Sequence, residues 1–280
     1  MDKHKGDAVN EYGRLKEVLM CPPERMKIKQ PLNNTQEQYK KENIDKNKAV
    51  KQHQNLQNVL KENGVRVHLL TPEEGLPEQV FTRDLGFASD QGLIIGQMNM
   101  SLREPETAYV KQWFDHNQWE YQEMTSGALE GGDVLIDGDL LFAGNSSRTT
   151  KTAIEELTAL FPDKKVISMP LERKYLHLDC VFNIISPGTA LLFPPALPVK
   201  TVREIGMHYR TITINEWEQF QLAANVLSIG SNTIISMPQN NSVNERMRAW
   251  GFHVIEVELS EIIKSGGAFR CVTFPLVKSK

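Results

Sequence analysis

The sequence SGGAFRCVTFP, residues 265–275, places one cysteine between a glycine turn and an apolar strand. Two adjacent glycines allow positive φ and a close approach of the backbone to a ligand. The residues from Cys271 to Phe274 favour a strand that enters a core. Cys271 is therefore a candidate nucleophile, although a lone cysteine is more often a small core residue. Partner residues elsewhere in the chain must decide between these interpretations.

The approach to Cys271 recurs earlier in the chain, where a polar residue also leads into an apolar strand. These lead-in residues are Asp84, Asp133, Asp179, Asn225 and Cys271. The first step is 49 residues long and the next three are 46 residues each. A turn glycine and a second apolar strand follow each of the first four, which predicts a hairpin. These glycines are Gly92, Gly138, Gly188 and Gly230.

A helix and a further strand are expected after each hairpin. Predicted helices begin near Pro105, Ala153 and Pro198, and at a capping box formed by Ser242 and Glu245. They lead to strands at residues 119–124, 209–214 and 252–257, among others. The N-terminal region supplies a strand at residues 15–20, a helix from a Thr35/Gln38 capping box to Gly64, and a strand at residues 65–70.

A strand at Cys271 would complete the N-terminal unit and close a ring of five ββαβ units, which removes open sheet edges. We therefore expect an α/β fold with one domain, residues 1–280, whose N- and C-terminal segments share a unit. In such a ring the lead-in residues all face one axis. The alternative is that acids before strands are turn formers, and the even spacing favours the ring.

The residues around the lead-in positions suit nucleophilic catalysis. Alternation along a strand would place His177 and Asp179 on one face and Cys180 on the opposite, buried face. His177 is the candidate acid and base, and Glu130 is the candidate carboxylate that orients it. Two further carboxylates, Asp84 and Asp179, would hold a guanidinium, whose planar fork pairs bidentately with carboxylates.

The reaction predicted from these groups is attack of Cys271 on the guanidinium carbon. His177 would protonate the departing amine and then deprotonate the water that releases a ureido product. A metal site formed by His177, Asp179 and Asp133 is the alternative, although no second histidine lies near.

Composition excludes several classes of function. The 280 residues include 32 lysine and arginine and 35 aspartate and glutamate residues, a net charge of −3, so no positive field attracts nucleic acid or anionic membrane. No apolar run could span a bilayer, and the polar start carries no export signal, which predicts a cytoplasmic protein. Three distant cysteines argue against a zinc ribbon and a disulfide framework. We expect no cofactor and no metal, and a homodimer is left open.

The whole chain resembles the guanidino-group-modifying (pentein) superfamily of dimethylarginine dimethylaminohydrolases, arginine deiminases and amidinotransferases. The resemblance implies a five-bladed β/α propeller around a pseudo-fivefold axis. It also implies a catalytic set of Cys271, His177 and Glu130, with Asp84 and Asp179 on the guanidinium. The family's arginines that hold the substrate carboxylate correspond to Arg103 and Arg148, and Arg148 could alternatively be a surface residue at a helix start.

The activity implied is hydrolysis of arginine or N-methylated arginine, with release of ammonia or an amine and a citrulline-type product. An arginine deiminase, an amidinotransferase and a non-catalytic propeller that acts as a binding surface are the alternatives. Ala268, Phe269 and Arg270 depart from the family's usual cysteine loop. The roles of Asp133, Asn225 and Arg270 stay open, and Cys21 and Cys180 are expected to be structural.

Overall fold

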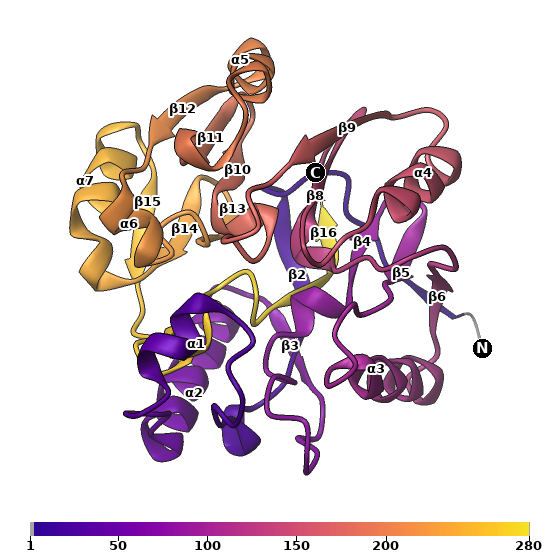
Figure 1. Ribbon diagram of the computed structural model, residues 1–280, viewed down its shortest axis with the longest axis vertical. Coiled ribbons are helices and arrows are strands. Elements are labelled where there is room, and N and C mark those ends of the chain that lie inside the picture. The colour runs from indigo at the N-terminus through magenta and orange to yellow at the C-terminus, as the bar shows by residue number, and fades with distance from the viewer. Residues whose placement is uncertain (1–2, 280) are drawn as a thin grey trace.

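The computed structural model describes residues 3–279, and its strands form five sheets (Figure 1). One sheet contains β16 (Phe274–Ser279), β2 (Arg14–Met20) and β3 (Arg66–Leu69). The next contains β1 (His4–Lys5), β6 (Trp119–Glu123), β5 (Gly92–Ile95) and β4 (Gly86–Ser89). The others are β7 (Val134–Asp137), β8 (Leu140–Asn145) and β9 (Lys165–Pro170); β10 (Phe182–Ser186), β11 (Thr189–Leu192) and β12 (Arg210–Thr213); and β13 (Leu227–Gly230), β14 (Thr233–Ser236) and β15 (His253–Glu256).

All five sheets share one pairing pattern. Two strands pair antiparallel, and the inner one also pairs in parallel with a third strand, as β8 does with β7 and β9. The predicted turn glycines adopt positive φ, for example 58° at Gly138 between β7 and β8. A parallel partner requires a crossover, which α4 (Lys151–Leu160) provides in this sheet. The predicted hairpin, helix and strand are therefore present.

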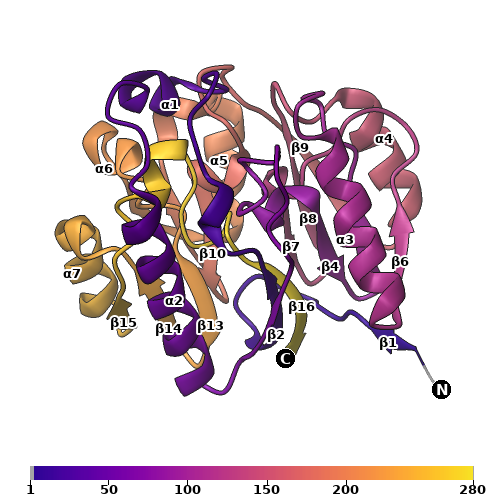
Figure 2. The same ribbon diagram turned by 90° about the horizontal axis from the view of Figure 1, so that it is seen from below.

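The two ends of the chain meet in one sheet. β16 pairs antiparallel with β2, and β2 pairs in parallel with β3. The C-terminal strand thus takes the place that the first hairpin strand takes in the other sheets. In Figure 2, α1 lies at the opposite end of the molecule from β1 and from the end of β16.

The lead-in residues are buried and lie in loops that bond to one another. Three of these loops are short 3-10 helices, namely η2 (Thr82–Leu85), η3 (Gly131–Asp133) and η4 (Leu178–Cys180). Hydrogen bonds connect each loop to the next and the fifth to the first. They run from Arg83 N to Cys271 O, from Arg83 Nε to Gly131 O, from Leu178 N to Asp133 Oδ1, from Asn225 Nδ2 to Asp179 O, and from Cys271 N to Asn225 Oδ1.

The helices lie outside the sheets (Figure 1). They are α1 (Asn34–Tyr39), α2 (Lys46–Glu62), α3 (Glu104–His116), α4, α5 (Val199–His208), α6 (Glu216–Phe220) and α7 (Asn241–Ala249), and the remaining 3-10 helices are η1 (Pro23–Arg25), η5 (Pro194–Ala196), η6 (Pro238–Asn240) and η7 (Ile262–Ser265). Their apolar sides pack on the sheets, so the core lies between sheet and helix. Within residues 3–279, no helix is both long enough and apolar enough to cross a membrane.

The prediction of a single helix from Thr35 to Gly64 is wrong, because α1 and α2 are separate helices. Asn43 adopts a φ of 60°, and its side chain bonds the backbone of Ile28, which ends helical geometry before α2. Asp45 then caps α2 by accepting the Lys48 N–H. The first helix is capped by Asn33, which accepts the Gln36 N–H, and not by Thr35.

The capping box expected at Ser242 and Glu245 is also wrong. The 3-10 helix η6 runs directly into α7, so the helix starts before Ser242. A capping box does occur at the start of α6, where Asn215 and Glu218 bond each other's backbone. Pro105 lies in the first turn of α3, as predicted.

Candidate active site

A buried pair joins two of the predicted catalytic residues. Glu130 directly precedes η3 and His177 directly precedes η4. Oε2 of Glu130 lies 2.7 Å from Nε2 of His177, and both side chains are fully buried. Gly132 makes room for the ring, because a Cβ at this position would lie 2.8 Å from the imidazole. The predicted contact between the histidine and its orienting carboxylate is present.

The charges around this pair keep the histidine protonated. Burial alone would lower the pKa of His177, but Asp84 and Glu130 raise it to about 10. Burial alone would raise the pKa of Glu130, but the hydrogen bond and positive charge of His177 lower it to about 2. The pair is therefore an imidazolium and a carboxylate at neutral pH, and His177 can donate a proton.

Asp84 lies on the other side of the imidazole. Its Oδ1 is 3.5 Å from His177 Nδ1, and its Oδ2 accepts a 2.6 Å hydrogen bond from Arg103. Neither Asp84 Oδ1 nor His177 Nδ1 has a hydrogen-bond partner among the residues that the structure describes. Buried polar atoms are rarely left so, and these two could bind a reacting group between them.

Cys271 shares a small cavity with Asp84. The cavity has a volume of about 10 Å³, and its wall includes Cys271, Asp84, Arg103, Arg148 and Glu78. His177 and Glu130 are not in its wall, so Asp84 connects the thiol's cavity with the catalytic pair. A space of this size holds no more than one water molecule. The chain around it must therefore move before a substrate can bind.

The backbone around Cys271 is held from two sides. Its N–H donates to Asn225 Oδ1 at 3.3 Å, and its carbonyl accepts the Arg83 N–H at 3.1 Å. Gly266 has a φ of 91°, and a Cβ on Gly267 would lie 2.4 Å from the Phe81 ring. Only glycines fit this turn without displacement. The open question about Asn225 thus has a structural answer, because its amide fixes the cysteine loop.

Asp133 likewise connects loops. Its Oδ1 accepts the Leu178 N–H at 2.8 Å, and its Oδ2 accepts the Ser146 hydroxyl at 2.6 Å. Burial raises its pKa to about 6. These bonds tie the η3 loop to the η4 loop that follows His177, so Asp133 supports the position of the histidine.

Strand alternation does not describe the segment after His177, and that expectation is wrong. Residues 178–180 form η4, whose three-residue turn does not alternate sides. His177 consequently faces Glu130, whereas Asp179 Oδ2 lies 3.3 Å from Arg270 Nε. Cys180 is buried as expected, but on the side of Asp179 rather than away from it, and its S–H donates to Asp179 Oδ1 at 3.6 Å.

Arg103 and Arg148 both line the cavity, but they differ in how they are held. Arg103 bonds Asp84 and also Glu106, through Nε and Nη2 at distances of 2.9–3.2 Å. Arg148 Nη1 lies 3.4 Å from Glu130 Oε1, and its Nη2 donates to the Leu32 carbonyl at 3.2 Å. Arg148 is therefore not a surface residue, and of the two it has the longer contacts with its partners.

Sequence reasoning did not include Glu78. This residue is buried, lines the cavity and accepts a 2.9 Å hydrogen bond from Gln36. Burial raises its pKa to about 7. Glu78 lies six residues before Asp84, outside the repeated lead-in positions, so their spacing could not reveal it.

Residues 32–36 cover the cavity. Asn33 Nδ2 donates to the Ser265 carbonyl at 2.9 Å, and Gln36 bonds Glu78. Leu32 and Asn33 both belong to the cavity wall. These few polar contacts hold the cover over Cys271, and we call residues 32–36 the covering segment.

Two groups of side chains in the described residues 3–279 have metal-ligand spacing. Asp84, Glu130 and His177 form one group, and Asp179, Cys180 and Cys271 form the other, each with its ligand atoms within 4.8 Å. The expected alternative of His177, Asp179 and Asp133 is neither of these. The first group is a poor cation site, because its carboxylates already face Arg103 and the imidazolium.

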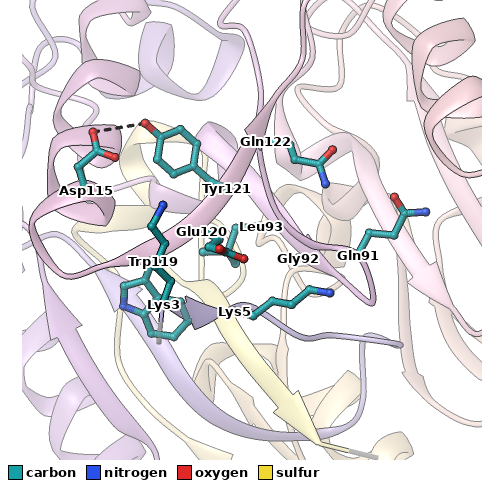
Figure 3. Close-up of a pocket in the computed structure, with 10 residues that line it drawn as sticks. All are labelled: Lys3, Lys5, Gln91, Gly92, Leu93, Asp115, Trp119, Glu120, Tyr121 and Gln122. Carbon is teal, nitrogen blue, oxygen red and sulfur yellow. Dashed lines mark hydrogen bonds between the residues drawn. The ribbon is translucent and has the colours of Figure 1, made fainter. Parts of the chain in front are cut away.

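Two larger hollows lie away from Cys271. One of about 480 Å³ borders β1 and β6, and its wall includes Lys3, Lys5, Trp119 and Tyr121 (Figure 3). Another of about 690 Å³ lies beside α6. Neither wall contains Glu130, His177 or a cysteine. The chemically distinctive groups are thus inside the ring of lead-in loops, not at the larger hollows.

Comparison with known proteins gives consistent matches along most of the chain. A family described as "N,N dimethylarginine dimethylhydrolase, eukaryotic" matches residues 22–278. YkgA, an uncharacterized protein of Bacillus subtilis, is 43% identical over 278 residues, which are 99% of this chain and 97% of YkgA. AgrE of Nostoc sp., a bifunctional arginine dihydrolase/ornithine cyclodeaminase, is 31% identical over 266 residues, which are 91% of this chain and 37% of AgrE. The chain thus spans little more than a third of AgrE.

Solved structures agree with these matches. Two crystal structures of the N-terminal domain of ArgZ each have a TM-score of 0.86, 28% identity, and coverage of 94% of this chain and 98% of that domain. One is a cysteine-to-serine mutant of this arginine dihydrolase bound to substrate, and the other is covalently bound to a reaction intermediate. The α/β architecture of this chain is therefore the one those structures have.

Proposed function

This chain belongs to the N,N-dimethylarginine dimethylhydrolase family, and we propose that it hydrolyses the guanidino group of free arginine or N-methylated arginine through a covalent intermediate on Cys271. Its enzyme relatives act on this group, which supports amidine hydrolysis as the activity. The observation that carries the proposal is the buried Glu130–His177 pair next to Asp84, which shares a cavity wall with Cys271.

The proposed reaction has two steps. The Cys271 thiolate attacks the guanidinium carbon, a C–S bond forms, and the C–N bond to the leaving amine breaks as protonated His177 supplies a proton. His177 then accepts a proton from water, whose oxygen attacks the same carbon, and the C–S bond breaks to release the ureido product. Glu130 keeps the imidazole oriented and stabilises its charge in the first step.

Asp84, Glu78 and Asp179 are the proposed partners of the guanidinium. Asp84 offers the Oδ1 atom that lacks a partner, and Glu78 lines the same cavity. A carboxylate oxygen of Asp179 lies within 4.8 Å of the Cys271 sulfur. Arg270 holds Oδ2 at 3.3 Å, whereas Oδ1 accepts the longer 3.6 Å contact from the Cys180 thiol, so Oδ1 is the oxygen that we propose for the substrate. Carboxylates suit a guanidinium because its N–H groups match them bidentately.

The two arginines would recognise the other end of the substrate. We propose that Arg148 binds the α-carboxylate, since its present contacts are a 3.4 Å approach to Glu130 and one carbonyl. Arg103 bonds Asp84 and Glu106 closely, so its main contribution would be to orient Asp84. Its direct contact with the substrate carboxylate, as the family resemblance implies, would require these bonds to rearrange.

We propose that the five sheets act as the blades of one β/α propeller domain spanning residues 1–280, with β2 and β16 sharing a blade. The cyclic hydrogen bonds between lead-in loops support a pseudo-fivefold axis through the site. This arrangement would place every candidate catalytic group near that axis, although the residues come from distant parts of the chain.

A substrate panel tests the proposed function. Arginine, monomethylarginine, dimethylarginine and agmatine are incubated with the enzyme, and ammonia, methylamine, dimethylamine and ureido product are measured separately. Dimethylamine release would assign a dimethylarginine hydrolase, and ammonia with citrulline would assign a deiminase. No product from any guanidine would contradict the proposal and leave the non-catalytic alternative.

A second candidate is an arginine dihydrolase, favoured by the likeness to AgrE and ArgZ along more than nine tenths of the chain. In that case the product from arginine would be ornithine, and citrulline would not accumulate. Measuring ornithine in the same panel separates the two candidates. Adding glycine and searching for a new guanidino product tests the amidinotransferase alternative.

A further inference from the structure

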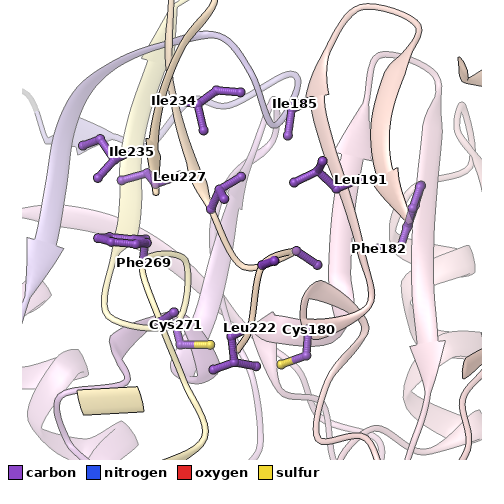
Figure 4. Packing of buried hydrophobic residues seen from close by; sticks show 14 of the residues in the cluster. Cys180, Phe182, Ile185, Leu191, Leu222, Leu227, Ile234, Ile235, Phe269 and Cys271 are labelled. Carbon is purple, nitrogen blue, oxygen red and sulfur yellow. The ribbon is translucent and has the colours of Figure 1, made fainter. Parts of the chain in front are cut away.

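A second thiol lies next to the proposed nucleophile. The Sγ atoms of Cys180 and Cys271 and a carboxylate oxygen of Asp179 all lie within 4.8 Å of one another. The two sulfurs point toward each other in Figure 4. The cysteines are 91 residues apart in the chain and reach this place from η4 and from the loop before β16. The hydrolysis proposed above assigns no step to Cys180.

The surroundings of Cys180 are those of a resting thiol with a proton acceptor. Its S–H donates to Asp179 Oδ1 at 3.6 Å, while Arg270 holds Oδ2 of the same carboxylate. A hydrogen bond with Cys271 and burial raise the pKa of Cys180 well above its ordinary value. Cys180 therefore stays protonated until Asp179 accepts its proton.

The two cysteines line different cavities. Cys180 lines a hollow of about 230 Å³ whose wall also includes Gly266 and Leu222. Cys271 lines the smaller cavity under the covering segment. Asn33 and Leu176 belong to both walls, so the hollow and the cavity adjoin.

We propose that Cys180 is a resolving thiol for Cys271, so that a hydroperoxide converts the pair into a reversible, inactivating disulfide. This proposal rests on the proposed function in one respect, because only a nucleophilic Cys271 would lose activity in this way. Formation of the disulfide itself does not depend on which guanidine the enzyme uses.

The chemistry balances in two steps. The Cys271 thiol is oxidised by a hydroperoxide, whose O–O bond breaks to give Cys271 sulfenic acid and one molecule of alcohol or water. The Cys180 sulfur then attacks the sulfenic sulfur, an S–S bond forms, and the S–O bond breaks. The proton of Cys180 passes to Asp179 and then to the departing hydroxide, which leaves as water.

Geometry favours this fate over capture of a metal ion by the same atoms. The guanidinium of Arg270 lies 3.3 Å from Asp179, and it would repel a divalent cation placed between that carboxylate and the sulfurs. A disulfide introduces no charge. Rotation of the two cysteine side chains would have to bring the sulfurs to the bonding distance of about 2.05 Å.

The test treats the reduced full-length protein with hydrogen peroxide and then alkylates the remaining thiols under denaturing conditions. Mass spectrometry should show one alkylated cysteine, Cys21, and a cross-linked pair of peptides that contain Cys180 and Cys271. Turnover should disappear in parallel and return fully after dithiothreitol treatment. Cys21 serves as the internal reference because it is buried in a different apolar cluster.

Three variants make the result decisive. Cys21→Ala should behave like the wild type, whereas Cys180→Ala and Cys180→Ser should keep turnover under reducing conditions. After peroxide, both Cys180 variants should form no cross-link, and Cys271 should proceed to sulfinic and sulfonic acids, which dithiothreitol does not restore. Using both Cys180 variants guards against one that fails to fold. Oxygenated Cys271 without a cross-link in the wild type, or sulfinic acid forming on Cys271 as fast in the wild type as in both Cys180 variants, would overturn the proposal. A cross-link in a protein that turns over no guanidine would contradict the proposed function and leave the thiol pairing supported.

Discussion

Protonation of His177 depends on two carboxylates that approach its ring from opposite sides. Glu130 accepts a hydrogen bond from Nε2, and Asp84 lies 3.5 Å from Nδ1. These charges outweigh the burial that would otherwise expel the proton. The imidazolium could thus serve as the general acid of the proposed first step, and binding of a cationic guanidinium near Asp84 would reduce this stabilisation. Substrate binding itself could then make His177 a better proton donor.

The first prediction concerns stability as a function of pH. The pKa of His177 is about 10 in the folded protein against 6.5 ordinarily, so its stabilising effect is full below about pH 6.5 and is lost as pH rises through 10. Urea unfolding between pH 6.5 and 10 should show the wild type losing more unfolding free energy than His177→Asn. Burial lowers the pKa of Lys278 to about 7, but this residue titrates in both proteins, so its effect cancels in the difference between their unfolding free energies. Parallel curves would contradict the charged pair.

A second prediction separates the two ends of the substrate. Loss of one charge-assisted hydrogen bond costs about 1.5–3 kcal/mol, which is roughly 10- to 150-fold in kcat/KM. Arg148→Ala should impair arginine or methylarginine by that factor relative to agmatine, which lacks the carboxylate. The comparison uses the ratio of kcat/KM for arginine to kcat/KM for agmatine. Arg148 also contacts Glu130, and a disturbance of Glu130 would lower both values and leave their ratio unchanged. The exposed Arg173→Ala is the matched control, and an unchanged ratio in Arg148→Ala would remove the carboxylate assignment.

Local sequence could predict that Cys271, His177 and Glu130 lie in neighbouring loops, because a regular spacing relates those loops. The same reasoning missed what each side chain contacts. It could not show that η4 would turn Asp179 toward Arg270, or that Glu106 would engage Arg103. Such partners depend on three-dimensional approach between residues whose order in the chain carries no periodic signal.

At the scale of elements, the covering segment borders the cavity of Cys271, and we expect it to control access to the thiol. Its contacts with the protein beneath include the bond from Asn33 to Ser265 and that from Gln36 to Glu78. Because so few hydrogen bonds hold the covering segment, it could open locally while the sheets stay folded. A cavity of about 10 Å³ is too small for a guanidino amino acid, so we expect such opening to accompany turnover.

Removal of one of these contacts should expose the thiol more often. Asn33 also caps α1, and loss of such a cap typically costs about 1 kcal/mol. Asn33→Ala should therefore increase the rate at which iodoacetamide alkylates Cys271 by about fivefold. The neighbouring exposed Asn34→Ala is the matched control, since its side chain bonds neither Gln36 nor Ser265. Equal rates in all three proteins would show that the thiol is reached by another route.

Element boundaries were predicted best where glycine or proline imposes them. The turn glycines and Pro105 lie where their patterns placed them, because positive φ or a missing N–H restricts the backbone directly. The caps at Thr35 and Ser242 failed for a different reason. Several polar residues follow one another at both places, and the bond that Asn33 accepts from Gln36 and the turn of η6 decided which one begins the helix.

The whole molecule depends on the pairing of its two ends. β16 pairs with β2, and it also contacts β4 of the neighbouring sheet. A chain that ends at Thr273 would leave β2 without this partner and should lose cooperative unfolding altogether. Deletion of residues 1–5 removes only the exposed edge strand β1, and this shortened protein should still unfold cooperatively. Cooperative melting of the C-terminal truncation, followed by circular dichroism, would contradict the closed ring.

The even spacing of the lead-in residues predicted this long-range pairing, since four complete units left one strand without neighbours. It could not predict the charges near the axis. Glu11, Arg83, Arg270 and Lys278 form a buried network there. Charged residues are expected at the surface by default, so only the folded chain shows that these are interior groups.

The central claim is that guanidine hydrolysis proceeds through a covalent bond to Cys271. Rapid acid quenching during turnover of arginine or dimethylarginine, followed by mass spectrometry of proteolytic peptides, tests it most directly. The account predicts an adduct of substrate minus its leaving amine on the peptide that contains Cys271, and neither adduct nor turnover in Cys271→Ser. Product formation by Cys271→Ser, or an adduct confined to Cys21 or Cys180, would contradict it.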